Sequence, residues 1–271
     1  MQDQFEHIRQ FSSTHKDQAK LISVTSGKGG VGKSSIVVNL AIAMAQLGKK
    51  VLIIDADTNL GNVDILLGMN PKFNFLNYVM DDLAIERILV KHHSGVSIIP
   101  NSSGNRYWKD INDNLRVKIF ELFYKLRPQF DYIIIDTAGG LSSISLEISI
   151  KADKVLLITT SEPTSINDTY AMIKILNSMK KDIPIDLLLN MVTSPTEVSD
   201  VYQRLSLVLE HFLGFSVGIC GYLLFDPGVR AAVHKQEPFI LMNPNSVASD
   251  NIINIAKIVN EMSLETNQSV K

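Results

Sequence analysis

The sequence predicts an α/β protein built on a doubly wound, mostly parallel sheet with helices on both faces, and three observations support this fold class. Apolar runs of strand length alternate along the chain with amphipathic segments of helix length. The runs are continuous rather than alternating with polar residues, which is typical of parallel strands covered on both faces. Polar residues directly follow several runs, and parallel strands bring their carboxyl ends to one edge of the sheet, where ligands bind in such folds.

The elements follow in order from this pattern. The predicted strands are 21–25, 51–55, 96–100, 132–136, 155–159 and 185–190, with a last run at 215–223. The predicted helices are 33–47, 111–127, 165–180, 197–212 and 246–264. Gly48 is expected to end the first helix, and the turn at 163–165 to open the third. Repeated strand–helix units imply right-handed crossovers. Because no linker or repeat divides the chain, we expect one domain at 21–271, preceded by a polar tail at 1–20.

Composition narrows the class of protein further. The 271 residues are 45% apolar, enough for an ample core, and the formal net charge of −2 gives no global reason to expect binding to nucleic acid. The single cysteine, Cys220, excludes an intrachain disulfide and is expected to be a buried strand thiol. There is no signal peptide and no apolar run of about 18 residues, so we expect a soluble, cytoplasmic protein.

A glycine-rich turn between the first strand and the first helix fits the phosphate-loop pattern G-x-x-x-x-G-K-[ST], as Gly27, Gly32, Lys33 and Ser34. Its glycines let successive backbone N–H groups converge on a phosphate chain, and the helix N-terminus adds free donors and partial positive charge. Lys33 would reach the β- and γ-phosphates, and the Ser34 hydroxyl would bind Mg²⁺. The alternative, a βα turn that binds nothing, is disfavoured by the motif's position between strand and helix.

Three carboxylates follow predicted strands at the same edge. Asp136, after the apolar run YIII, is the Walker-B type residue expected to hold Mg²⁺ or one of its waters, with a helix cap as the alternative. Asp55 is placed near the metal. Asp57, two residues later, is predicted to position the attacking water. Asn190, at the end of a later strand, carries an amide that suits adenine, although it could equally cap a turn.

The complete loop, K-G-G-V-G-K-S at 28–34, resembles the deviant Walker A loop of the MinD/ParA family of dimeric ATPases. The resemblance continues through DAD at 55–57, IIIDTAGG at 133–140 and LLNM at 188–191. It implies a P-loop NTPase fold, ATP and Mg²⁺ as ligands, and a homodimer formed with ATP, in which Lys28 of each chain reaches the γ-phosphate of the other. The nucleotide-binding set carried over from the family is Gly27, Lys28, Gly29, Gly30, Val31, Gly32, Lys33, Ser34, Ser35 and Asn190.

The stretch at 161–177, SEPTSINDTYAMIKILN, looks more like the flagellar branch of this family, FlhG (also called FleN), than like division-site MinD. That resemblance implies control of flagellar number and placement through an FlhF-type GTPase and, in some bacteria, a flagellar transcription activator. FlhG tails often begin D-Q-A-x-x-L-R, a helix that stimulates the GTPase. Asp3, Gln4, Ile8 and Arg9 are aligned with this pattern, with Phe5 in place of Ala and Ile8 in place of Leu. At 58–59 the chain has Thr-Asn where that branch usually has Leu-Gly.

MinD-type proteins commonly end in a basic amphipathic helix that lies on membranes. The stripe here comprises Ile252, Ile255, Ala256, Val259 and Met262, and the polar face carries glutamates and no aromatic anchor. The stripe is therefore expected to dock on the core, and peripheral contact with the membrane rests on family analogy alone. A ParA-like DNA-partitioning ATPase is the alternative of a different class, and the absence of a basic stripe argues against it. A nitrogenase-type electron carrier would need two cluster cysteines per chain.

Overall fold

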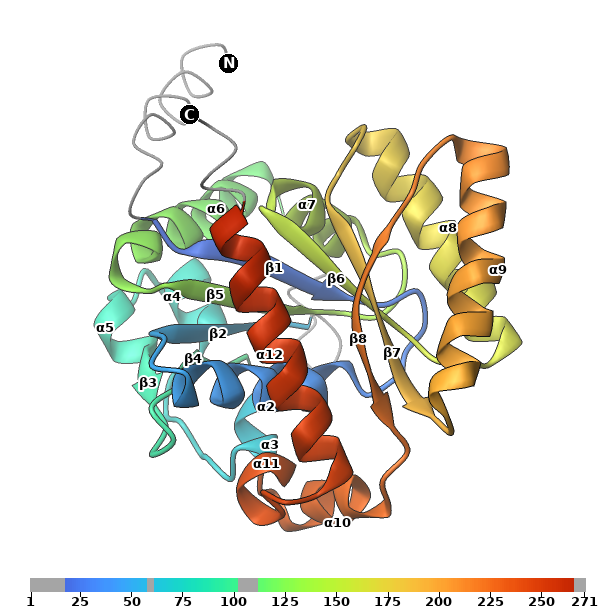
Figure 1. Cartoon of the computed structure of the whole chain (residues 1–271). Coiled ribbons are helices and arrows are strands. Elements are labelled where there is room, and N and C mark those ends of the chain that lie inside the picture. The colour runs from blue at the N-terminus through green and yellow to red at the C-terminus, as the bar shows by residue number, and fades with distance from the viewer. Residues whose placement is uncertain (1–17, 58–60, 102–111, 266–271) are drawn as a thin grey trace.

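The computed structural model describes residues 18–57, 61–101 and 112–265, and these residues form one sheet with helices on both faces (Figure 1). The sheet has eight strands in the order β3-β4-β2-β5-β1-β6-β7-β8, all paired in parallel except β3 with β4. The strands are β1 Lys20–Thr25, β2 Val51–Ala56, β3 Val90–Lys91, β4 Ser97–Ile99, β5 Tyr132–Thr137, β6 Lys154–Thr159, β7 Ile185–Val192 and β8 Gly218–Leu224. The predicted fold class is confirmed.

The helices fall between these strands and after the last one. They are α2 Lys33–Gln46, α3 Val63–Leu66, α4 Phe75–Asp81, α5 Ile85–Ile88, α6 Asp113–Leu126, α7 Ser143–Lys151, α8 Pro163–Met179, α9 Pro195–Leu213, α10 Pro227–Lys235, α11 Phe239–Met242 and α12 Val247–Glu265. A 3₁₀ turn, η2, at Arg127–Gln129 follows α6. Within the described residues, none of these helices is long and apolar enough to cross a membrane.

The central strands are buried on both faces, as their continuous apolar runs predict. On β5, Ile134 packs into the core beneath α2 and α12, whereas Ile133 and Ile135 pack into the opposite core with α4, α6 and α7. On β7, Leu188 faces the first core, and Leu187 and Leu189 face a third one formed with α8 and α9. Figure 1 shows α12 crossing the near face of the sheet, with α8 and α9 together at its β7–β8 side.

The structure corrects several predicted boundaries. The first strand begins at Lys20, and Ala19 is already buried, so the tail ends before the predicted residue 20. Helix α8 begins two residues early because Pro163 occupies its first turn, where a missing N–H removes no bond. The short elements α3, α4, α5, α10, α11 and β3 were not predicted. These helices have four to nine residues and β3 has two, which is shorter than the stretch of about 11 residues for a helix, or about four for a strand, in which the pattern can be recognised.

The C-terminal helix docks on the core as expected. Four residues of its predicted stripe, Ile252, Ile255, Ala256 and Val259, are at most 3% exposed, and α12 packs against α2 and β8. The fifth, Met262, belongs to a group of residues whose side chains are not described. The apolar face that an interfacial helix would present to lipid is therefore used inside the protein.

Cys220 lies in β8 and is fully buried, which confirms the expected strand thiol. Its Sγ atom donates to the backbone oxygen of Leu187, at 3.3 Å. Burial, together with the nearby Asp186 carboxylate, raises the pKa of this thiol well above its usual range.

Candidate active site

The glycine-rich loop runs from the end of β1 to the start of α2, where the sequence predicted it. Other segments hold it closely. The Gly140 N–H donates to the Ser26 oxygen at 2.8 Å, and the Ser26 hydroxyl donates to the Lys28 oxygen at 2.8 Å. A Cβ atom on Gly27 would lie 2.4 Å from the backbone of Asp168 in α8. Only glycine fits at this contact, so the loop is braced by α8 and by the segment after β5.

Lys33, the first residue of α2, points inward. It is 7% exposed, and its Nζ atom lies 3.1 Å from Oδ1 of Asp136, which is fully buried at the end of β5. The α2 helix thus begins with a buried cation next to a buried carboxylate. Because an unpaired charge is costly to bury, each group lowers the cost of burying the other.

Asp136 retains an unused oxygen. Desolvation raises the pKa of its carboxyl, while the Lys33 ammonium and a hydrogen bond from the Ser34 hydroxyl oppose that rise. Its Oδ2 atom is buried and has no hydrogen-bond partner among the described residues. The helix that Asp136 was alternatively predicted to cap is capped by Ser142, whose hydroxyl accepts from the Ser145 N–H. A carboxylate oxygen beside a hydroxyl suits a hard cation such as Mg²⁺.

Asp55 and Asp57 play different parts. The strand β2 continues to Ala56, and Asp55 lies in register with Asp136 on β5. The two oxygens of Asp55 accept from the N–H groups of Asp57 and Val63, at 3.1 and 3.2 Å. Burial, with the neighbouring Asp136 charge, raises the pKa of Asp55 to about 8.

Asp57 follows the strand and is half-buried, and its carbonyl accepts from Nδ2 of Asn101 at 2.7 Å. The segment that comes next, 58–60, lies outside the described residues and includes the Thr-Asn departure from the flagellar branch.

Asn190 lies within β7, not beyond its end, because the strand runs on to Val192 after an irregularity in its pairing with β8. Its side chain reaches the phosphate loop, where Nδ2 donates to the Val31 oxygen at 2.8 Å. A Cβ on Gly32, which has a φ of 85°, would lie 2.4 Å from that same nitrogen. The amide therefore supports the loop directly, and its role at the base of a nucleotide stays a prediction.

Lys28 has different partners from the Lys33–Asp136 pair. Its Nζ atom lies 2.8 Å from Oε2 of Glu162 and 3.2 Å from Oγ1 of Thr164. The Lys28 and Glu162 side chains are 41% and 65% exposed. Neither Glu162 nor Thr164 was predicted as a site residue, because they lie more than 130 positions from Lys28 in the chain.

The other predicted site residues lie in the loop, in the first turn of α2 or outside the described residues. Gly29 and Gly30 are exposed on the loop, Val31 is buried under it, and Ser34 and Ser35 are half-buried in the first turn of α2. The tail residues Asp3, Gln4, Ile8 and Arg9 lie outside the described part of the chain.

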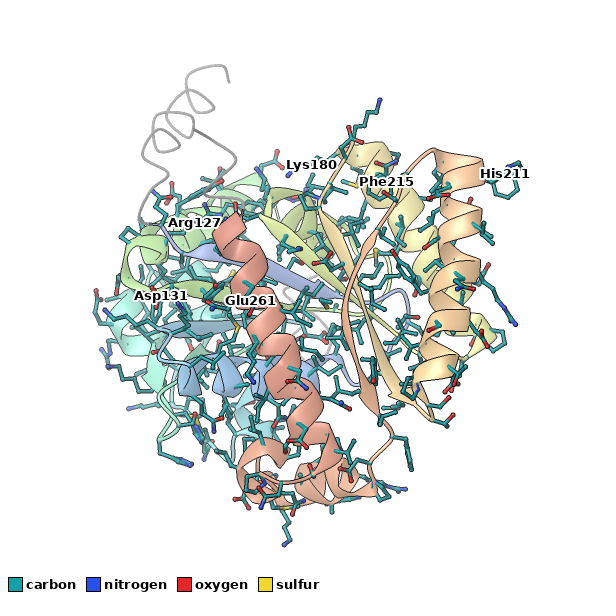
Figure 2. The ribbon with its side chains drawn as sticks, in the orientation of Figure 1. Arg127, Asp131, Lys180, His211, Phe215 and Glu261 are labelled. Carbon is teal, nitrogen blue, oxygen red and sulfur yellow. The ribbon has the colours of Figure 1, made fainter. Side chains whose placement is uncertain are left out.

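A hollow of about 450 Å³ lies at the opposite edge of the sheet, where β6, β7 and β8 begin. Its lining includes Lys154, Asp186 and Phe215, and Figure 2 shows Phe215 near the ends of α8 and α9. Within the described residues, no three His, Cys, Asp or Glu side chains gather as a metal-binding group.

Comparison with known proteins agrees with this geometry. A family model described as an AAA domain matches residues 19–189. The antiactivator FleN of Pseudomonas aeruginosa is 35% identical over 96% of this chain and 92% of its own length. The flagellum site-determining protein YlxH of Helicobacter pylori is 32% identical, over 90% and 83%. The chain belongs to the MinD/ParA family of ATPases.

A solved MinD/ParA structure shares the fold. The septum site-determining protein MinD of Pyrococcus horikoshii, complexed with Mg-ADP, aligns with a TM-score of 0.73 over 90% of this chain and 97% of its own, at 22% identity. This MinD/ParA ATPase therefore has the family's ATP-binding domain, and its relatives FleN and YlxH confirm the likeness to the flagellar branch.

Proposed function

We propose that this ATPase is a switch in which ATP joins two chains and hydrolysis separates them. The observation that carries the proposal is that the two loop lysines have different partners at different burial. Lys33 forms an ion pair with the buried Asp136, whereas Lys28 forms one with the exposed Glu162. A single chain already has Lys33 for its own phosphates. The exposed Lys28 can therefore leave Glu162 and bind the γ-phosphate of a second chain.

Within each site, the residues would divide the work. Backbone N–H groups of the loop and Lys33 bind the phosphates, and Asn190 holds the loop and meets the adenine. Ser34 and Asp136, with Asp55 behind them, would hold Mg²⁺, and the unpartnered Oδ2 of Asp136 fits that part. The ion would neutralise charge on the phosphates. Asp57 orients the water for attack.

Measurement of molecular mass with nucleotide tests the switch. With Mg²⁺ and a non-hydrolysable ATP analogue the wild-type chain is expected to be a dimer, and with ADP a monomer. Lys28→Ala should bind nucleotide and stay monomeric with either, as judged by light scattering after size exclusion. A Lys28→Ala protein that still dimerises and hydrolyses ATP normally would remove Lys28 from this role.

Asp57→Ala separates assembly from turnover. It should bind ATP and form dimers that persist, because only the positioning of water is lost, and phosphate release should fall to background. Turnover at the wild-type rate would show that Asp57 does not position the water.

The output of the switch is proposed to be control of flagellar number and placement from the cytoplasm. The relatives FleN, an antiactivator, and YlxH, a flagellum site-determining protein, support this assignment. The partners would be an FlhF-type GTPase, contacted through Asp3, Gln4, Ile8 and Arg9, and a flagellar transcription activator. The Asp57→Ala protein with ATP, with and without residues 1–20, should capture the GTPase only when the tail is present; equal capture by both would exclude the tail.

A further inference from the structure

We propose that Glu162 is a positioning residue for Lys28, which it holds on its own chain until the phosphates of a second chain take the lysine over. The inference deepens the proposed dimer switch and rests on it. Nothing in the comparisons assigns a role to Glu162, and the contact joins residues 134 positions apart.

The first argument is the choice of residue. Glu162 is the N-cap of α8, a position that favours Ser, Thr, Asp or Asn because their short side chains accept from the first N–H groups. The Glu162 side chain makes no such bond. It reaches outward to the Lys28 ammonium instead, at 2.8 Å, with the Thr164 hydroxyl as a second acceptor at 3.2 Å. Capping does not explain a glutamate here, and the contact with Lys28 does.

The second argument is that the turn carrying Glu162 is rigidly supported. Buried hydroxyl groups tie the end of β6 to the first turns of α8: Ser165 accepts from the Thr160 N–H at 3.1 Å, and Thr169 donates to Thr159 at 2.8 Å. Ser161, the residue before Glu162, is also held by a hydrogen bond to the Glu197 side chain in α9, a bond that lowers the pKa of Glu197. Supporting contacts of this kind fix a functional side chain more closely than a free loop would.

The third argument is that the contact is easily exchanged. An ion pair at this exposure is weak and screened by salt, unlike the buried pair of Lys33 and Asp136. A triphosphate carries more negative charge than one carboxylate. The Lys28 ammonium would therefore leave Glu162 and bind the triphosphate when a second chain brings it close. Glu162 therefore orients Lys28 in the single chain and competes mildly with dimer formation.

The test measures Lys28 directly in the nucleotide-free monomer, where dimerisation plays no part. Acetylation of lysines by a small activated ester, followed by mass spectrometry of peptides, gives the rate at Lys28 relative to Lys257 in the same sample. Glu162→Gln should raise the relative rate about two- to fivefold, in line with the loss of an exposed ion pair. Glu210→Gln, which removes an exposed carboxylate at the far end of α9, is the matched control and should change nothing. High salt should raise the wild-type rate and abolish the difference.

The second measurement concerns assembly. With the non-hydrolysable ATP analogue, Glu162→Gln should lower the dimer dissociation constant about two- to tenfold, because two such contacts are released per dimer. An unchanged labelling rate at Lys28, or a dimer weakened by Glu162→Gln, would overturn the role of Glu162. A wild-type chain that stays monomeric with the analogue would overturn the proposed switch instead, whatever the labelling shows.

Discussion

Lys28 and Lys33 belong to the same loop, yet their environments are opposite. Lys33 is buried and paired with a fully buried carboxylate, whereas Lys28 is at the surface and paired with an exposed one. Buried pairs depend strongly on both partners, and exposed pairs contribute little. The buried Lys33 therefore contributes to the stability of the single chain. The exposed Lys28 contributes little to that stability and is available to contact a second chain.

The largest effect is expected on nucleotide affinity. Lys33→Ala removes the cation aimed at the phosphates and should weaken binding of Mg-ADP at least about 100-fold, close to 3 kcal/mol. Lys28→Ala should leave the affinity of the monomer for Mg-ADP within about twofold, because Lys28 is paired with the exposed Glu162 rather than with a buried carboxylate at the phosphate site. Calorimetric titration of both variants with Mg-ADP measures the two affinities. An equal loss of affinity in both would show that Lys28 and Lys33 contribute equally to the site of a single chain.

The next effect is on folding. Lys33→Ala leaves the Asp136 carboxylate buried without its cation, which should lower the free energy of unfolding by about 3 kcal/mol. Adding Asp136→Asn removes the stranded charge and should recover at least half of that loss. Urea unfolding of the nucleotide-free proteins checks this. A double variant no more stable than Lys33→Ala alone would mean that packing, not charge, explains the loss.

The buried carboxylates should also make stability depend on pH. Asp55 keeps its proton in the folded protein up to a pKa of about 8, whereas the unfolded chain releases it near 3.8. Between these values raising the pH favours the unfolded state, so the stabilising effect of the protonated group, full below pH 3.8, is lost as the pH rises through 8. The melting temperature of the nucleotide-free protein should therefore fall from pH 6 to pH 8.5. Asp55→Asn should flatten that trend, and an equal slope in the variant would rule out Asp55 as its source.

The smallest effect is the loss of the outer pair. Lys28→Ala should change the free energy of unfolding by less than about 1 kcal/mol, because the bond to Glu162 is exposed. The same urea experiment measures it, with Lys33→Ala alongside. A loss comparable to that of Lys33→Ala would show that Lys28 is built into the fold of its own chain.

The sequence was sufficient for the sheet and for the phosphate loop, because both are local patterns. A continuous apolar run and a run of glycines before a lysine show themselves within ten residues. It also predicted that Asp136 lies at the edge of the sheet that carries the loop, since parallel strands end at a common edge, but it did not predict the contact with Lys33. It could not show that Asn190 supports the loop, because that contact joins residues 159 positions apart in the chain.

The contact of Glu162 with Lys28 was beyond the sequence for a related reason. It depends on how α8 packs on the loop at Gly27, which no periodicity records. One local signal was present: a glutamate immediately before Pro163, at a helix start, where a shorter acceptor is usual.

The burial of Cys220 has a practical consequence. The chain has a single cysteine, and its thiol is shielded and resists ionisation, so thiol reagents should pass over the native protein. One cysteine introduced on the surface, for example Ser216→Cys, would then be the sole site to accept a fluorophore or spin label, and Cys220 would not have to be removed. If nucleotide brings two labelled chains together, the distance between the two labels can be measured directly. The measurement is simple because the buried Cys220 does not react with the label.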